Sequence, residues 1–287
     1  MSVDGVGELA LLQRIKPYLG AGAGRDDAAI IPDGDGFLVA STDMFVEGVH
    51  FDLGWMTAED AGWRSLALAL GDLAAKGAQP GWALAALAVP KGWTVEQVSG
   101  LYSGMHALAG RWQMPIAGGD MSAIDGPAVL SLTVAGRTSK RPLGRWEARP
   151  GWAVAVTGPL GAAAVALRGR RAHRVEPLIE SGRRLNELGL CCGDISDGLV
   201  REMEKFAAMS GAGSIIQADL VARAAGASLE DALTSGEEAE LVCVGPRDMV
   251  LGAGLSIVGE TIPDRAVKLV GASLQSTGYD HFGRAAQ

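Results

Sequence analysis

The segment Ser41-Thr42-Asp43-Met44-Phe45-Val46-Glu47-Gly48-Val49-His50-Phe51 begins at the end of an apolar run, residues 37–41, that is typical of a β-strand. A turn rich in Pro, Asp and Gly, residues 32–36, separates this strand from an earlier one at residues 28–31. Asp43 therefore follows a predicted strand end. The segment thus predicts two strands joined by a turn, the second leading into a carboxylate.

Outward from this segment, helix and strand patterns alternate along the chain. The strongest helix pattern covers residues 58–76, with Thr57 as its N-cap and Gly77 at its end. Other helices are expected at residues 8–18, 94–112, 175–190 and 197–209, and other strands at 82–89, 114–117, 128–135, 153–157, 214–218, 241–244 and 256–260. This alternation predicts an α/β (α+β) fold. Residues 137–152, rich in Arg, Pro and Gly, form the expected linker between domains at residues 1–140 and 141–287.

Composition excludes several classes of protein. The chain has 287 residues, 48% of them hydrophobic, and its formal net charge is −8, so neither a disordered chain nor a nucleic-acid binder is expected. The apolar runs at residues 65–75 and 82–89 are too short for a membrane span, and the N-terminal residues do not resemble a signal peptide. The three cysteines form no CxxC motif. We therefore expect a reduced, cytoplasmic protein with no membrane or nucleic-acid partner.

The acidic residues occupy particular places. Asp72 lies within the apolar pattern of the helix at residues 58–76, where neighbours such as Leu68 and Leu70 indicate burial. An unpaired buried carboxylate costs several kcal/mol, and Mg²⁺ compensates it because this ion prefers oxygen ligands and bridges to phosphates. For any one acid alone, a helix cap or a turn is the commoner explanation, although less so for Asp72. The remaining acids at predicted strand ends or helix starts are Asp26, Asp27, Asp43, Asp120, Asp194 and Asp197.

Other kinds of catalytic site find no support in the sequence. The chain contains no GxxxxGK[ST] phosphate loop, and a GxGxxA string at residues 5–10 follows no predicted strand. It also contains no HExxH or GxSxG motif. Gly118 and Gly119 could let backbone N–H groups approach a phosphate, although a tight turn is the commoner explanation of a glycine pair. The acidic residues remain the main indication of function.

The chain resembles the thiamine-monophosphate kinases, a family of the aminoimidazole-ribonucleotide-synthetase-like superfamily. The matching segments occur in family order from end to end, and those at residues 43–51 and 278–283 are the most specific to the kinase. These segments are Gly7-Glu8-Leu9, Arg25-Asp26-Asp27-Ala28-Ala29, residues 41–51, residues 71–78, Gly118-Gly119-Asp120, Asp194-Ile195-Ser196-Asp197-Gly198-Leu199, residues 236–241 and Gly278-Tyr279-Asp280-His281-Phe282-Gly283.

The resemblance implies a two-domain fold that dimerises through N-terminal strands, with the active site in the cleft. It implies that ATP phosphorylates thiamine monophosphate to thiamine diphosphate with Mg²⁺. Metal ligands would be Asp26, Ser41, Thr42, Asp43, Asp72, Asp120, Asp194 and Asp197, of which Asp43, Asp72, Asp120 and Asp197 would carry catalysis. ATP contacts would be Tyr102, Gly118, Gly119, Arg145 and Ser196. His50, Glu237 and Tyr279 would line the thiamine monophosphate site.

This chemistry is consistent with the residues, because a phosphate acceptor has a second pKa of ~6 and needs no general base. Three features depart from the family pattern: Ala239 in place of an aromatic residue, Leu178 after Pro177, and a second half that is short around residues 168–176 and 219–235. All three fall in the half that shapes the acceptor pocket. Two alternatives therefore remain open: a relative that uses ATP with another phosphate-bearing acceptor, and a non-catalytic nucleotide-binding homologue. A selenophosphate synthetase is disfavoured, because the first cysteine is Cys191.

Overall fold

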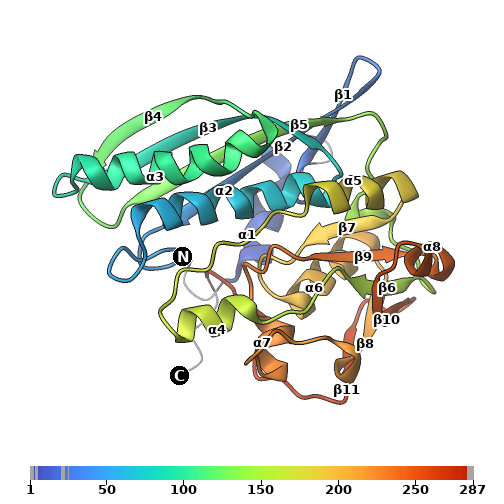
Figure 1. Ribbon diagram of the computed structural model, residues 1–287. Helices are drawn as coiled ribbons and strands as arrows, with labels where there is room; N and C mark the ends of the chain where they lie inside the picture. Colours follow the sequence, from blue (N-terminus) through green and yellow to red (C-terminus); the bar gives the residue numbers. More distant parts are fainter. Residues whose placement is uncertain (1–2, 4–5, 21–22, 25, 283–287) are drawn as a thin grey trace.

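The computed structural model describes residues 3, 6–20, 23–24 and 26–282 (Figure 1). Arg25 and Gly283, which belong to two of the matching segments, lie outside the described residues. Up to residue 138 the elements are α1 (Glu8–Ile15), η1 (Lys16–Tyr18), β1 (Ala29–Asp33), β2 (Gly36–Val46), α2 (Ala58–Ala75), β3 (Gln79–Pro90), α3 (Val95–Ala109), η2 (Gly110–Trp112), β4 (Ile116–Ile124) and β5 (Val129–Thr138).

The second half of the chain begins with a short helical turn, η3 (Arg145–Glu147), between the two sheets. The elements that follow are β6 (Ala153–Val156), α4 (Ala162–Arg168), α5 (Ile179–Leu188), β7 (Cys191–Asp194), α6 (Leu199–Ser210), β8 (Gly213–Gln217), η4 (Ala218–Leu220), α7 (Leu229–Thr234), β9 (Leu241–Gly245), α8 (Arg247–Gly252), β10 (Ser256–Ile262) and β11 (Val267–Val270).

Both sheets are mixed. The first has the strand order β1-β2-β5-β3-β4, in which only the β3–β4 pair of the described strands is parallel. The second has the order β11-β8-β10-β6-β9-β7, with a parallel β11–β8 pair. Helices α2 and α3 run along one face of the first sheet (Figure 1). The predicted α/β class is therefore confirmed.

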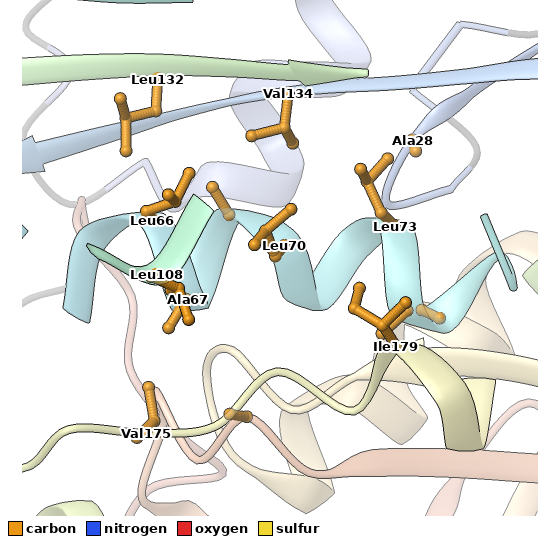
Figure 2. Packing of buried hydrophobic residues seen from close by; sticks show 14 of the residues in the cluster. Ala28, Leu66, Ala67, Leu70, Leu73, Leu108, Leu132, Val134, Val175 and Ile179 are labelled. Carbon is orange, nitrogen blue, oxygen red and sulfur yellow. The ribbon is translucent and has the colours of Figure 1, made fainter. Parts of the chain in front are cut away.

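Helix α2 is the central packing element. The Thr57 side chain accepts a hydrogen bond from the Asp60 N–H and so caps the first turn. Leu66 and Leu70 face Leu132 and Val134 of the first sheet, and Figure 2 shows these side chains between the helix and the strands. Burying such side chains stabilises the fold by about 1.5–3 kcal/mol each. The apolar face of α2 thus packs against the first sheet and stabilises it.

Helix α5 joins the two halves by packing on the end of α2. Ile179 and Leu185 belong to the same buried cluster as α2, and Figure 2 shows Ile179 on the side of that helix away from the first sheet. Gly182 allows close approach, because a Cβ there would overlap the carbonyl oxygen of Ala74. In the second half, α6 packs on its sheet through Met203 and Phe206. No helix among the described residues is long and apolar enough to cross a membrane.

Several predicted element bounds are wrong. Strand β2 continues to Val46 and β4 to Ile124, so Asp43 and Asp120 lie within strands and not after them. The short predicted strand at residues 114–117 stopped too early because glycine is a poor strand residue, but β4 pairs through Gly118 and Gly119 with β3. The helix predicted from residue 175 begins at Ile179, after Pro177. Strands β7 and β11 and the short helices α7 and α8 were not predicted.

Candidate active site

A cavity of about 950 Å³ lies between the two halves of the chain. Its walls come from β2, α2, the loop between β7 and α6, the segment before β9 and the C-terminal segment. The predicted site residues that line it are Asp26, Ser41, Thr42, Asp43, His50, Asp72, Arg145, Asp194, Ser196, Asp197, Glu237 and Tyr279.

Three carboxylates meet at the floor of this cavity. Oxygen atoms of Asp27, Asp72 and Asp194 all lie within 4.8 Å of one another. Asp72 comes from the buried face of α2, and only 7% of its surface is exposed; the Ser41 hydroxyl donates a hydrogen bond to its carboxylate. Burial raises the pKa of Asp72 and of Asp194 well above the ordinary value, and neighbouring carboxylates act in the same direction. We refer to Asp27, Asp72 and Asp194 as the acid cluster.

Asp43 stands beside the acid cluster on β2. Burial, together with the charges of Asp27 and Asp197 and against the opposing charge of Lys205, raises its pKa to about 6. Like charges gathered in a buried place disfavour ionisation unless a cation balances them. The acid cluster and Asp43 therefore form a place where a cation would be stabilised.

Two buried cations, Lys76 and Arg145, already pair with carboxylates at the acid cluster. The Nζ of Lys76 lies 2.6 Å from Asp26 Oδ1 and 3.2 Å from Asp27 Oδ2. Arg145, which is 2% exposed, pairs with Asp27 and donates to Glu202 over 2.6 Å. Burial opposes the charge of Asp27, but Arg145 and Lys76 outweigh it and hold its pKa below the ordinary value. Asp27 is thus ionised and fixed in place.

The loop Asp194–Asp197 is held by a second ion-pair network. Lys205 Nζ lies 2.6 Å from both Asp197 Oδ2 and Glu202 Oε1. The Ser196 hydroxyl donates to Glu202 Oε1 over 3.2 Å. Because Glu202 also pairs with Arg145, this network connects the two sides of the acid cluster. Lys205 offsets part of the negative charge of the cavity.

Three aromatic rings line one part of the cavity, which we call its aromatic end. His50 and His281 lie with ring centroids 5.2 Å apart, and Tyr279 meets His281 edge-on at 4.8 Å. The Val46 N–H donates to His50 Nδ1, and burial lowers the pKa of His50 below the ordinary value. The imidazole of His50 is therefore neutral at pH 7, and its ring presents an uncharged aromatic surface.

Glu237 lies at the same end of the cavity and is bound by Arg64 of α2. Its φ of 59° is in the left-handed region, and its N–H donates to the carbonyl oxygen of Ser196. The residue before it, Gly236, packs so tightly that a Cβ would overlap that same carbonyl oxygen. Gly236 thus leaves room for the close contact with the Asp194–Asp197 loop, and Glu237 takes the strained left-handed conformation next to it.

The structure does not bring every predicted residue into this cavity. Tyr102, Gly118, Gly119 and Asp120 line a separate, shallower pocket of about 380 Å³ at the β4 edge of the first sheet. Strands β5 and β3 separate β4 from the β2 strand of Asp43. Three strand spacings amount to about 14 Å, so Asp120 and Asp43 are not neighbours within one chain.

Sequence reasoning missed several residues that the geometry makes prominent. Both Asp26 and Asp27 were named as candidate acids, but the resemblance assigned only Asp26 to the metal, whereas Asp27 completes the three-carboxylate group. An adjacent pair of acids offers no pattern that tells which one faces the cavity. The ion-pair partners Arg64, Lys76, Glu202 and Lys205 were also missed, although a lysine ending an apolar helix could have been noted.

Comparison with known proteins shows which family the chain is similar to. Residues 25–138 match the family "AIR synthase related protein, N-terminal domain". The thiamine-monophosphate kinase of Rhodopirellula baltica is 34% identical, with 82% of this chain and 79% of the relative covered. The thiamine-monophosphate kinase of Mycobacterium tuberculosis H37Rv is 35% identical over 82% of this chain and 74% of the relative. That of Methanospirillum hungatei is 30% identical over 94% and 98%.

Solved structures show the same relationship. A structure described as "AaThiL complexed with AMPPCP and TMP" superposes with a TM-score of 0.86 at 26% identity, covering 96% of this chain and 97% of the other. The hydrogenase maturation protein HypE of E. coli, at 18% identity and a TM-score of 0.71 over 98% of both chains, shares the fold. By its sequence relatives and its fold, the chain belongs to the thiamine-monophosphate kinase family.

Proposed function

We propose that this protein transfers the terminal phosphoryl group of ATP directly to the phosphate of thiamine monophosphate, forming thiamine diphosphate and ADP. The observation that carries the proposal is the buried acid cluster at the floor of a cavity large enough for two ligands. The similar structure bound to AMPPCP and TMP supports the choice of ligands. The single bond broken joins the terminal phosphorus to its bridging oxygen, and the bond formed joins that phosphorus to an acceptor oxygen.

The residues present fit Mg²⁺. Asp26 Oδ2 is buried and receives no hydrogen bond from the described residues, Asp27 Oδ2 faces only the Lys76 ammonium at 3.2 Å, and the donor set is entirely carboxylate and hydroxyl oxygen. We propose Asp27, Asp43, Asp72 and Asp194 as the residues that hold the metal, with Asp26, Ser41, Thr42 and Asp197 beside them. When bound, Mg²⁺ offsets the negative charge of the phosphates and aligns the donor with the acceptor.

The protein's own residues supply orientation. Lys205 and Arg145 hold Asp197 and Asp27 in fixed positions, so that these carboxylates need no rearrangement when the ligands bind. The acceptor phosphate has a second pKa of ~6 and is largely ionised at pH 7, so no side chain has to remove a proton from it. A site without a general base is therefore sufficient for this reaction.

The aromatic end of the cavity suits the cationic thiazolium ring of thiamine. We propose that Tyr279 and His50 contact this ring, because aromatic faces attract a cation by about 0.5–2 kcal/mol. Glu237, fixed by Arg64, adds a negative charge at the same end. This places the acceptor between the rings and the acid cluster.

The pocket of Tyr102, Gly118, Gly119 and Asp120 has no ligand assigned by the geometry of one chain, and its role toward ATP and metal remains a prediction. We also propose the division into domains at residues 1–140 and 141–287, because each sheet is built from one contiguous stretch of chain.

A homodimer is proposed through the first sheet. Met44, Leu84 and Met121 are exposed on strands of this sheet and alternate with buried residues such as Phe45 and Ala85. Exposed apolar patches of this kind mark association surfaces. Leu84→Glu should lower the mass measured by sedimentation from that of a dimer to that of a monomer. A wild-type protein that sediments as a monomer would contradict the proposal.

The activity is tested by comparing acceptors. The protein is incubated with ATP and Mg²⁺ and with thiamine monophosphate, thiamine or AMP, and products are separated by chromatography. We expect thiamine diphosphate from thiamine monophosphate and no phosphorylation of the other two. Rapid transfer to a different phosphate-bearing acceptor would support the relative with another substrate, and ATP binding without any transfer would support a non-catalytic homologue.

A further inference from the structure

Lys76 follows directly on α2 and is completely buried. Its ammonium group meets three oxygen atoms, two from the adjacent residues Asp26 and Asp27 and one from the distant Cys192. Asp26 Oδ1 lies 2.6 Å away and Asp27 Oδ2 3.2 Å away, and the ammonium donates to the carbonyl oxygen of Cys192 over 2.6 Å. The three N–H donors of an ammonium therefore meet three oxygen atoms.

This oxygen set is of the kind that binds a hard cation. Two carboxylates and a backbone carbonyl are common ligands of metal ions, and the lysine ammonium is a compact point charge on a flexible stem. Arg145 provides a second positive charge, with its Nη1 3.9 Å from Asp26 Oδ1, but its planar group reaches Asp27 from another direction. The ammonium thus occupies the position of a bound cation and offsets the negative charge of Asp26 and Asp27.

We propose that Lys76 is a tethered cation of the acid cluster and a positioning residue for Asp27. The proposal rests on the proposed phosphoryl transfer only for its effect on turnover. Asp27 is bound at one oxygen by Arg145 and approached at the other by Lys76, and it belongs to the acid cluster with Asp72 and Asp194. Removing the ammonium would free Asp27 to turn and would leave two buried carboxylates facing one guanidinium.

Two substitutions separate the charge of Lys76 from its volume. Lys76→Ala removes three methylene groups and the ammonium, and the space left matches n-propylammonium. Lys76→Met removes the charge but fills the same space, so no added cation can enter. Lys91→Ala, at an exposed turn after β3, removes a lysine that has no partner among the described contacts and serves as the matched control.

The first measurement uses neither metal nor substrates. Thermal denaturation of each variant is followed with and without n-propylammonium. We expect the amine to raise the melting temperature of Lys76→Ala and to leave Lys76→Met, Lys91→Ala and the wild type unchanged. If Lys76→Ala folds poorly, the yield of folded protein on refolding with the amine replaces the melting temperature. Equal responses of Lys76→Ala and Lys76→Met, or no response of either, would overturn the proposal.

The second measurement tests positioning. In Lys76→Ala the Mg²⁺ concentration for half-maximal turnover should rise about 10- to 100-fold, as is common when a partner of a metal ligand is removed. n-Propylammonium should lower this Mg²⁺ concentration by at least about tenfold in Lys76→Ala and should leave it unchanged in Lys76→Met. A Mg²⁺ requirement unchanged from the wild type would refute the positioning role. A wild-type protein without kinase activity would refute the proposed function instead, and the melting data would still test the tethered cation.

Discussion

Asp72→Asn should stabilise the metal-free protein while it removes activity. Asp72 is buried beside Asp27 and Asp194, and the oxygen atoms of the three lie within 4.8 Å. Two full charges at that separation repel by about 3.5 kcal/mol at an effective dielectric constant of 20. Asparagine has nearly the same shape and can still accept the hydrogen bond from Ser41, so it removes the repulsion without opening a cavity.

The net gain is smaller than the full repulsion, because the wild-type protein can protonate Asp72 instead. We expect an increase of about 1–3 kcal/mol in the free energy of unfolding at pH 8, or about 2–5 °C in melting temperature. The size of this gain in the free energy of unfolding depends on pH. The pKa of Asp72 is higher in the folded state than its ordinary value of 3.8. The wild type therefore loses stability as the pH rises from the unfolded-state pKa to the folded-state pKa. The advantage of asparagine should therefore shrink toward zero near pH 4.

The assay is thermal denaturation without divalent cations at pH 4, 6 and 8, followed by turnover with Mg²⁺ at pH 8. Asp125→Asn, at an exposed turn, makes the same chemical change outside the acid cluster and should alter neither quantity. Turnover of Asp72→Asn should fall by at least about 100-fold, because the site loses an anionic metal ligand. A less stable Asp72→Asn protein at pH 8, or one with wild-type turnover, would refute the reasoning.

Three further predictions concern the cavity. Gly236→Ala would force a Cβ against the Ser196 carbonyl oxygen and should cost about 1–3 kcal/mol of stability in denaturant titrations, whereas Gly252→Ala, which meets open space, should cost less than about 0.5 kcal/mol. Tyr279→Ala should raise the KM for thiamine monophosphate about tenfold with kcat little changed, and an unchanged KM would exclude Tyr279 from the acceptor site. Because the pKa of Asp43 is about 6, protons should compete with Mg²⁺ below that pH, so the Mg²⁺-induced rise in melting temperature should be smaller at pH 5.5 than at pH 7.5; equal rises would contradict this assignment.

The sequence was informative where a local pattern determines the structure. The apolar neighbours of Asp72 predicted its burial, and the structure confirms it. The cap at Thr57 and the end of α2 near Gly77 are confirmed for the same reason, because capping depends on residues only a few positions apart. The alternation of helix and strand patterns was sufficient for the fold class.

The sequence was uninformative where distant segments meet. The ion pairs of Lys76 with Asp26 and of Arg145 with Glu202 join positions 50 or more residues apart, and no periodic pattern encodes them. The expected linker at residues 137–152 contains Arg145, which is buried under the acid cluster. Composition alone indicated a loop there, because it cannot show that a charged side chain has a buried partner.

The predicted strand ends also gave wrong positions for two of the candidate acids. An α/β pattern favours acids at strand ends, but Asp43 and Asp120 lie within longer strands that have two other strands between them in the first sheet. Their separation depends on the strand order, which pairs β2 with β5 and β4 with β3. Strand order is set by the packing of the whole sheet and not by any one segment.

The most direct test of phosphoryl transfer at the acid cluster is a single-turnover measurement. Wild-type protein in excess over ATP is mixed with thiamine monophosphate and Mg²⁺, and ADP and thiamine diphosphate are quantified together over time. The account predicts that the two products form in equal amounts and at the same rate, and that Asp43→Asn forms neither while Asp125→Asn matches the wild type. ADP formed without thiamine diphosphate, or thiamine diphosphate formed by Asp43→Asn at the wild-type rate, would contradict it.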